Sequence, residues 1–129
     1  MYFKLSKNCI INDIENWIKK NSPNLKENTL ENIKITFGEV LQNIIRHGHK
    51  NKINEQDFIE VEYQLTGEKI IFLIRDYGLP CNPESFLNKR FFPSESGQMG
   101  LSIIRKLTDE FLIKPLHDGN ETKLVFKIK

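Results

Sequence analysis

Hydrophobic residues recur at helical spacing in two stretches of the first half of the chain. Both stretches repeat apolar side chains every three or four residues, which is typical of amphipathic helices. The first contains Ile10, Ile11, Ile14, Trp17 and Ile18. The second contains Ile33, Phe37, Val40, Leu41, Ile44 and Ile45. The polar segment 21–24 separates them, so we predict one helix from Ile10 that ends before this segment. We predict a second from Leu25 to about Arg46, with Asn24 as candidate N-cap.

The rest of the chain is patterned mainly as strands. Residues 58–65 alternate between apolar and polar side chains, which predicts a half-exposed strand. The apolar run 70–74 suits a central strand, and further strands are expected around Phe3 and Leu5, at 111–116 and at 123–128. Helical spacing returns from Met99 to Phe111. Because strands follow one another in sequence, the fold class is predicted to be α+β, a two-layer sandwich with a mixed, mainly antiparallel sheet and helices on one face.

Bulk composition narrows the function classes. A length of 129 residues fits one domain, residues 1–129, and the net charge of +2 without a basic cluster gives no reason to expect nucleic acid. The apolar runs are shorter than the roughly 18 residues of a membrane helix. Cys9 and Cys81 form neither a zinc motif nor a disulfide framework. We therefore expect a soluble, cytoplasmic protein that contacts neither membrane nor nucleic acid directly.

A polar stripe lies beside the apolar stripe of the second helix. Glu39, Asn43 and His47 are spaced four residues apart, which places them on one helix face at the border of the core. A carboxylate and a carboxamide fixed there are suited to hold a metal–phosphate group, whereas a plain amphipathic helix would carry Lys and Glu.

Two further motifs lie downstream. Asp76 ends the most buried predicted strand, where a carboxylate needs a partner such as a ligand amino group, and Gly78 gives the backbone access to a flat ring or a positive φ. The other reading of this motif is an ordinary turn. Gly97 and Gly100 open the third predicted helix, where free N–H groups can bind phosphates. An ordinary loop-to-helix junction could contain the same two glycines.

Taken in order, these motifs resemble the GHKL nucleotide-binding superfamily, which includes gyrase-type ATPases and histidine-kinase catalytic domains. They are the Glu-x-x-x-Asn helix, the strand-terminal Asp-x-Gly, a Pro-containing segment of about residues 79–96 and a Gly-x-x-Gly-Leu helix start. Within the superfamily, the chain is most similar to the anti-sigma-factor serine/threonine kinases. That similarity rests on three features: the 129-residue length, the pair His47-Gly48 directly after the Asn motif, and the sequence of segment 101–110.

The resemblance implies a role for each matching residue. ATP and Mg²⁺ would be the cofactors, with Asn43 as metal ligand and Glu39 as general base. Asp76 would accept a hydrogen bond from the adenine N6 group. The remaining implied nucleotide contacts are His47, Gly78, Gly97, Gly100, Leu101, Arg105 and Thr122, with Arg46 a further candidate for the phosphates. Residues 79–96 would form a lid over the site.

Some positions depart from the family pattern. Pro80 stands where many members carry a second glycine, Asn82 where the anti-sigma group commonly has an acidic residue, and Gly119-Asn120-Glu121-Thr122 replaces the usual Gly-Thr before the last strand.

The resemblance implies a kinase that phosphorylates a small anti-anti-sigma-type protein, binds a sigma factor and forms a homodimer. A non-catalytic nucleotide-sensing module and the catalytic half of a split histidine kinase remain the alternatives.

Overall fold

The computed structural model describes residues 1–5, 10–49, 52–53, 56–80 and 98–128. The side chains of residues 47, 48, 98 and 99 lie outside the described part. The strands are β1 (Tyr2–Lys4), β2 (Phe58–Leu65), β3 (Lys69–Asp76), β4 (Glu110–Leu116) and β5 (Gly119–Lys127). The helices are α1 (Ile10–Asn21), α2 (Glu27–Asn43) and α4 (Gln98–Leu107), and a π-helical turn, η1 (Ile44–Gly48), continues α2.

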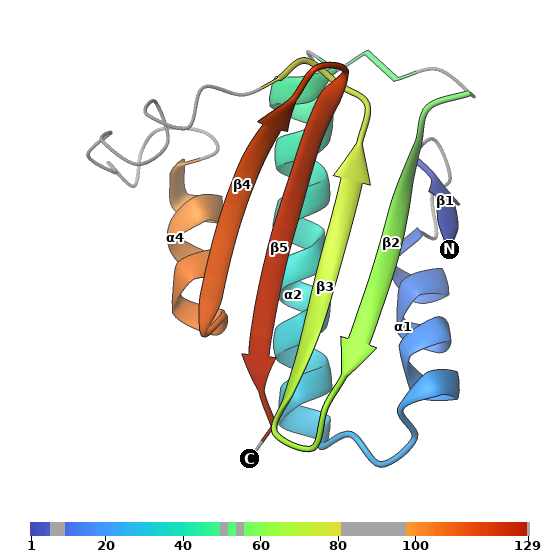
Figure 1. The fold of residues 1–129 in the computed structure, drawn as a ribbon, viewed down its shortest axis with the longest axis vertical. Coiled ribbons are helices and arrows are strands. Elements are labelled where there is room, and N and C mark those ends of the chain that lie inside the picture. The colour runs from blue at the N-terminus through green and yellow to red at the C-terminus, as the bar shows by residue number, and fades with distance from the viewer. Residues whose placement is uncertain (6–9, 50–51, 54–55, 81–97, 129) are drawn as a thin grey trace.

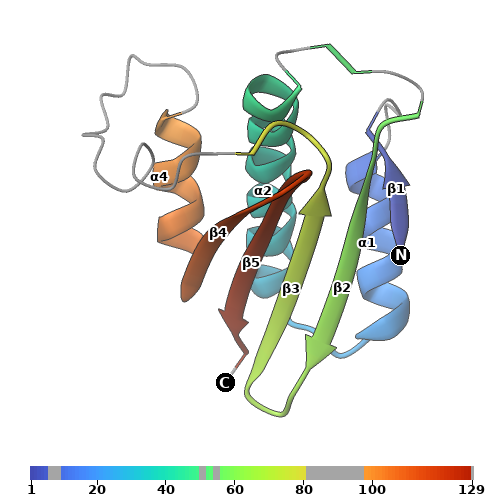
Figure 2. The same cartoon turned by 45° about the horizontal axis from the view of Figure 1, so that its top comes forward.

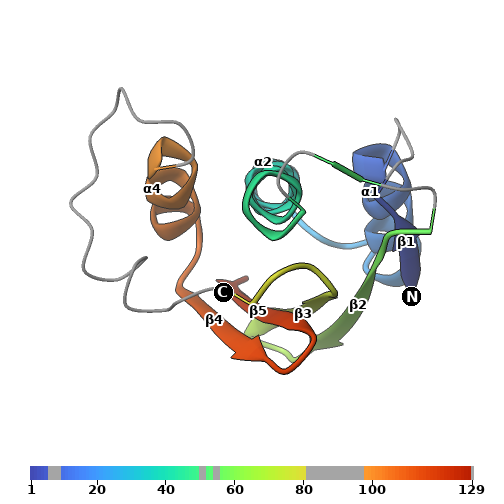
Figure 3. The ribbon, with the colours of Figure 1, turned by 90° about the horizontal axis from the view of Figure 1, so that it is seen from above.

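The strands form one sheet in the order β1-β2-β3-β5-β4, and every pair of neighbours is antiparallel. The helices α1, α2 and α4 of the described part pack on one face of this sheet (Figure 1), and the view from above separates the two layers clearly (Figure 3). The predicted α+β sandwich with helices on one face is therefore confirmed.

The core lies between the sheet and the helices because alternate strand residues point to the same face. Ile70, Phe72 and Ile74 of β3 are fully buried on the helix side. Phe37 of α2 packs edge-to-face on Phe72, with ring centroids 5.0 Å apart. The middle of α2 is thus anchored on the central strand, which fixes the position of everything near its C-terminal end.

Both ends of α2 differ from the prediction. Asn24 is not its N-cap: the Leu25 N–H donates to the Ser22 carbonyl, which closes a turn around Asn24, and the helix begins at Glu27 with Lys26 in the cap position. The regular α-helix ends at Asn43 rather than near Arg46, because residues 44–48 adopt the wider π-helical turn. The four-residue stripe therefore holds for Glu39 and Asn43, and the α-helical spacing that extended it to His47 was wrong.

The last helix and strand also have different bounds. The predicted helical end at Phe111 was wrong, because both the N–H and the hydroxyl of Thr108 bond the Ile104 carbonyl and β4 begins two residues later. Strand β5 starts at Gly119, before the expected 123, because residues 120–122 already pair with both β3 and β4. No helix in the described part of the chain is long and apolar enough to cross a membrane.

Candidate functional site

The ends of α2 and β3 lie near the top of Figure 1, and α4 starts beside the last turns of α2, where a Cβ at Gly100 would meet Glu39 (Figure 2). Each of these three ends carries one of the motifs identified in the sequence. Glu39 and Asn43 are half-buried on α2, one turn apart. The neighbouring Val40 and Leu41 are only 3% and 4% exposed and hold this turn against the core. The fold thus brings together three motifs that are separated by up to 60 residues of chain.

Gly100 places the start of α4 directly against the polar groups of α2. A Cβ at Gly100 would lie 2.6 Å from Glu39 Oε2 and 3.9 Å from Asn43 Oδ1. Any larger residue would therefore push the carboxylate away. A carboxylate at a helix N-terminus is also favoured by the positive end of the helix dipole. The structure therefore places Glu39, Asn43 and Gly100 in one cluster.

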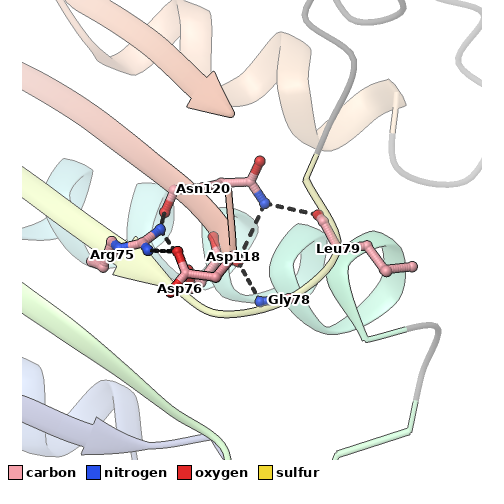
Figure 4. Close-up of polar contacts among 6 residues, drawn as sticks. All are labelled: Arg75, Asp76, Gly78, Leu79, Asp118 and Asn120. Atoms are coloured by element: carbon pink, nitrogen blue, oxygen red, sulfur yellow. Dashed lines mark hydrogen bonds and ion pairs between the residues drawn. The ribbon is translucent and has the colours of Figure 1, made fainter. Parts of the chain in front are cut away.

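A second cluster surrounds Asp76 at the end of β3. Asp76 is only 2% exposed, and the strand register sets it opposite Asn120 of β5. The Gly78 N–H donates to Asp76 Oδ1 over 3.1 Å, and Asn120 Nδ2 donates to the same oxygen over 3.3 Å. Asn120 Nδ2 also donates to the Leu79 carbonyl over 2.9 Å (Figure 4). Asn120 therefore holds both the carboxylate and the segment that follows it.

Burial raises the pKa of Asp76, and the hydrogen bonds from Gly78 and Asn120 oppose this shift, as do the charges of His49 and Arg75. Both hydrogen bonds go to Oδ1. Within the described part of the chain, no hydrogen bond reaches Oδ2. One oxygen of this buried carboxylate thus remains able to accept a hydrogen bond from a ligand amino group.

Two residues that the sequence analysis did not place in the site support this cluster. Gly119 has a φ of 157°, and a Cβ there would lie 2.0 Å from the Asp76 carbonyl oxygen, so only glycine allows β5 to approach β3 this closely. Arg75 forms an ion pair with Asp118 and donates to the backbone carbonyls of Asp76 and Asn120 (Figure 4). Both residues therefore hold the end of β3 and the start of β5 together.

The other predicted contacts occupy different environments. Thr122 is 3% exposed and lies two residues from Asn120, on the helix side of β5. Leu101 is buried in the core beside Gly100. Arg105 is exposed on α4 and Arg46 is half-buried. Gly78 does not have a positive φ, since among the described glycines only Gly119 does.

Part of the predicted site lies outside the described residues. This applies to Gly97, to Cys81 and Asn82, and to nearly all of the expected lid, of which only Leu79 and Pro80 are described. The backbone of His47 lies in η1, and its side chain is outside the described part.

The residues present fit an adenine nucleotide with Mg²⁺. The Oδ2 of Asp76 can accept a hydrogen bond from an exocyclic amino group. The space beside Gly100, next to Glu39 and Asn43, would be filled by the side chain of any other residue at that position. The amide oxygen of Asn43 is a hard ligand, and Mg²⁺ commonly takes only one or two protein ligands beside water and phosphate oxygens. No group of three or more acidic, His or Cys side chains suited to a metal occurs among the described residues, so the phosphates would complete such a site.

Comparison with solved structures gives the same fold. The catalytic domain of the histidine kinase ThkA matches with a TM-score of 0.61 at 16% identity, covering 99% of this chain and 95% of that one. The histidine kinase domain of the Erythrobacter litoralis EL346 blue-light activated kinase matches with a TM-score of 0.60 at 14% identity, covering 98% of this chain and 62% of that one. The RsbU and RsbW domains of Rv1364c from Mycobacterium tuberculosis match with a TM-score of 0.61 at 12% identity, covering 99% of this chain and 31% of that one. The chain thus spans less than two thirds of the latter two proteins.

A comparison with curated protein sequences found no significant match. The family model described as "histidine kinase-like ATPase domain" matches residues 10–126, which include both residue clusters at the end of the sheet. Fold, site chemistry and family model therefore agree, and the chain belongs to the histidine kinase-like ATPase domain family, the GHKL group of ATP-binding domains.

Proposed function

We propose that this chain is an ATP-dependent serine/threonine protein kinase of the anti-sigma-factor type. It would transfer the γ-phosphoryl group of ATP to a serine of a small anti-anti-sigma-type protein and bind a sigma factor in alternation with that protein. The observation that carries the proposal is the position of the Glu39 carboxylate, next to Asn43 and against the start of α4 at Gly100. A carboxylate beside a phosphate site can accept the proton of an attacking hydroxyl group.

Each residue then has one task. Asp76 accepts a hydrogen bond from the adenine N6 amino group, and Gly78 and Thr122 line the base pocket. Asn43 provides an oxygen ligand to Mg²⁺, which when bound neutralises charge on the phosphates. Gly100 binds the phosphates through backbone N–H groups at the start of α4, and Gly97, which lies outside the described residues, is assigned to the phosphates from the sequence. Glu39 takes the proton from the attacking serine hydroxyl.

A second candidate function is a nucleotide-sensing module without catalysis. The same closeness of Gly100 to the Glu39 side chain favours it, because α4 lies against α2 at this point. Phosphate groups bound there would change the position of α4, and a protein partner that contacts α4 would respond to ATP and ADP differently.

Phosphoryl transfer distinguishes these functions. The chain is incubated with radiolabelled ATP, Mg²⁺ and the anti-anti-sigma-type protein of the same organism, and the product is tested for acid stability. We expect acid-stable phosphoserine, and a loss of about 100-fold or more in rate for Glu39→Gln with ATP binding retained. Glu31→Gln is the matched control, because Glu31 is exposed on the same helix.

Each other outcome of this experiment excludes one of the candidate functions or residue roles. Full transfer by Glu39→Gln would remove Glu39 from the chemistry. An absence of transfer, combined with partner binding that depends on ATP or ADP, would support the sensing module. An acid-labile product would indicate transfer to histidine, as in a split histidine kinase.

We also propose a homodimer formed through the face of the sheet that the helices leave open (Figure 3). Apolar side chains from neighbouring strands lie on that face, including Ile71, Leu73 and the 55% exposed Leu112. Sedimentation equilibrium gives the mass in solution directly, and a monomer at micromolar concentration would contradict this part of the proposal.

A further inference from the structure

His49 is a half-buried histidine that neither the sequence motifs nor the proposed chemistry uses. It follows η1, and its backbone N–H donates to the Ile44 carbonyl over 3.2 Å. Its side chain is 10% exposed, and its Nδ1 lies 3.6 Å from Asp57 Oδ2. Its Nε2 is buried and has no hydrogen-bond partner among the described residues. An imidazole in such a place requires an explanation.

The strand register explains which groups surround it. Ile59 of β2 is opposite Asp76 of β3, and Asp57 lies two residues before Ile59. Asp57 immediately precedes β2, and the Leu5 N–H donates to its carbonyl over 2.9 Å, which continues the β1–β2 pairing by one residue. With strand alternation extended to this residue, Asp57 and Asp76 are diagonal neighbours on the helix side, where such pairs are roughly 7–8 Å apart. The imidazole of His49 rests against the first of these carboxylates and interacts electrostatically with the second.

Other charges near Asp76 act from the opposite side. Arg75 points away from the helices and reaches Asp118 and the backbone carbonyl of Asp76. His49 itself is at the C-terminal end of the α2–η1 helix, where the carbonyl groups favour a positive charge. From the helix side, His49 is therefore placed to supply positive charge to the Asp76 carboxylate.

We propose that His49, held by Asp57, is a positioning residue of the base site: it supports the ionised form of Asp76 and thereby the preference for a base with an exocyclic amino group. This inference rests on the proposed adenine site. An ionised carboxylate only accepts hydrogen bonds, so it matches the N6 amino group of adenine. A protonated carboxyl group also donates, so it would match the O6 keto oxygen of hypoxanthine, and discrimination between the two bases would fall.

The first test needs no nucleotide. The side-chain carboxyl carbon of Asp76 is followed by NMR against pH in the full chain, in His49→Gln and in the control His117→Gln, whose exposed histidine lies in the β4–β5 turn. We expect the Asp76 midpoint to rise in His49→Gln only, because its positive partner is lost. An unchanged midpoint in His49→Gln would overturn the proposal.

Wild-type protein provides a check that does not depend on the variant folding. The Asp76 carboxyl signal should show a second inflection at the pH where the His49 imidazole signal titrates. Its absence would also overturn the proposal.

The second test measures specificity as the ratio of the dissociation constants for IDP and ADP by calorimetry near pH 6. We expect the preference for ADP to fall by about threefold or more in His49→Gln and to stay the same in His117→Gln. An unchanged ratio would refute the specificity role. If wild type bound neither nucleotide, the proposed function would fail, while the NMR titration would still decide whether His49 and Asp76 are coupled.

Discussion

Replacing Asp76 by asparagine separates the contribution of the carboxylate to ligand binding from its contribution to folding. The substitution keeps the size of the side chain and one acceptor oxygen. The two hydrogen bonds from Gly78 and Asn120 both go to Oδ1, so an amide oxygen in the same place retains them. What changes is Oδ2, which becomes an amino group and can no longer accept a hydrogen bond from adenine N6.

The expected loss of affinity follows from that single bond. A hydrogen bond to a charged group contributes about 1.5–3 kcal/mol, which corresponds to about 10- to 150-fold in the dissociation constant. Isothermal titration with ADP measures it. Asp109→Asn is the matched control, because Asp109 is exposed and bonds the Lys127 N–H at the far end of β5. Wild-type affinity in Asp76→Asn would refute the assignment of Asp76 to the base.

Whereas the affinity for ADP should fall in Asp76→Asn, its free energy of unfolding should rise relative to wild type. Burial raises the pKa of Asp76 above its ordinary value of 3.8, so the native state binds this proton more tightly than the unfolded state does. Such a group contributes stability that is fully present below the unfolded pKa and is lost as pH rises through the folded pKa. The neutral asparagine has no such dependence. We expect Asp76→Asn to gain in urea stability relative to wild type as pH rises above about 4, and a difference that shrinks with rising pH would contradict this reasoning.

Two further substitutions test the frame of the site. Gly119→Ala should lower stability by about 1–3 kcal/mol, because the added Cβ meets the backbone oxygen of Asp76 at 2.0 Å. For a chain of 129 residues this is a decrease of about 4–11 °C in Tm, whereas Gly67→Ala, with nothing within 4 Å, should change stability by less than about 1 kcal/mol. Asn43→Ala should abolish the part of the thermal shift with ATP that depends on Mg²⁺ and leave ADP binding without metal intact. An equal Mg²⁺ dependence in this variant would mean that the metal is held elsewhere.

The parts of the fold that local patterns determine were predictable. The alternation at 58–65 gave the bounds of β2, and the motifs at Glu39, Asn43 and Asp76 were each found on the expected element. These features depend on periodicity and on the cost of burying a carboxylate, both of which can be read from a few neighbouring residues.

The parts that depend on strand register were not predictable. Asn120 lies 44 residues after Asp76 and meets it only because β3 pairs with β5 in this register. Segment 119–122 reads as a polar turn, and only the pairing on both sides shows that it is a strand. His49 could not be recognised for the same reason, since its neighbours Asp57 and Asp76 come together through β2 and β3.

The two ends of the proposed nucleotide site are built in different ways, and this difference matters for function. The base end is held by paired strands, by Asn120 and by Arg75, so it is defined before a ligand arrives. The phosphate end depends on α4 lying against α2, where a Cβ at Gly100 would meet the Glu39 side chain rather than backbone. A side chain can move more easily than a paired strand. Changes between ATP and ADP should therefore be felt at α4 while the base remains in place, which is what either a kinase or a nucleotide sensor requires.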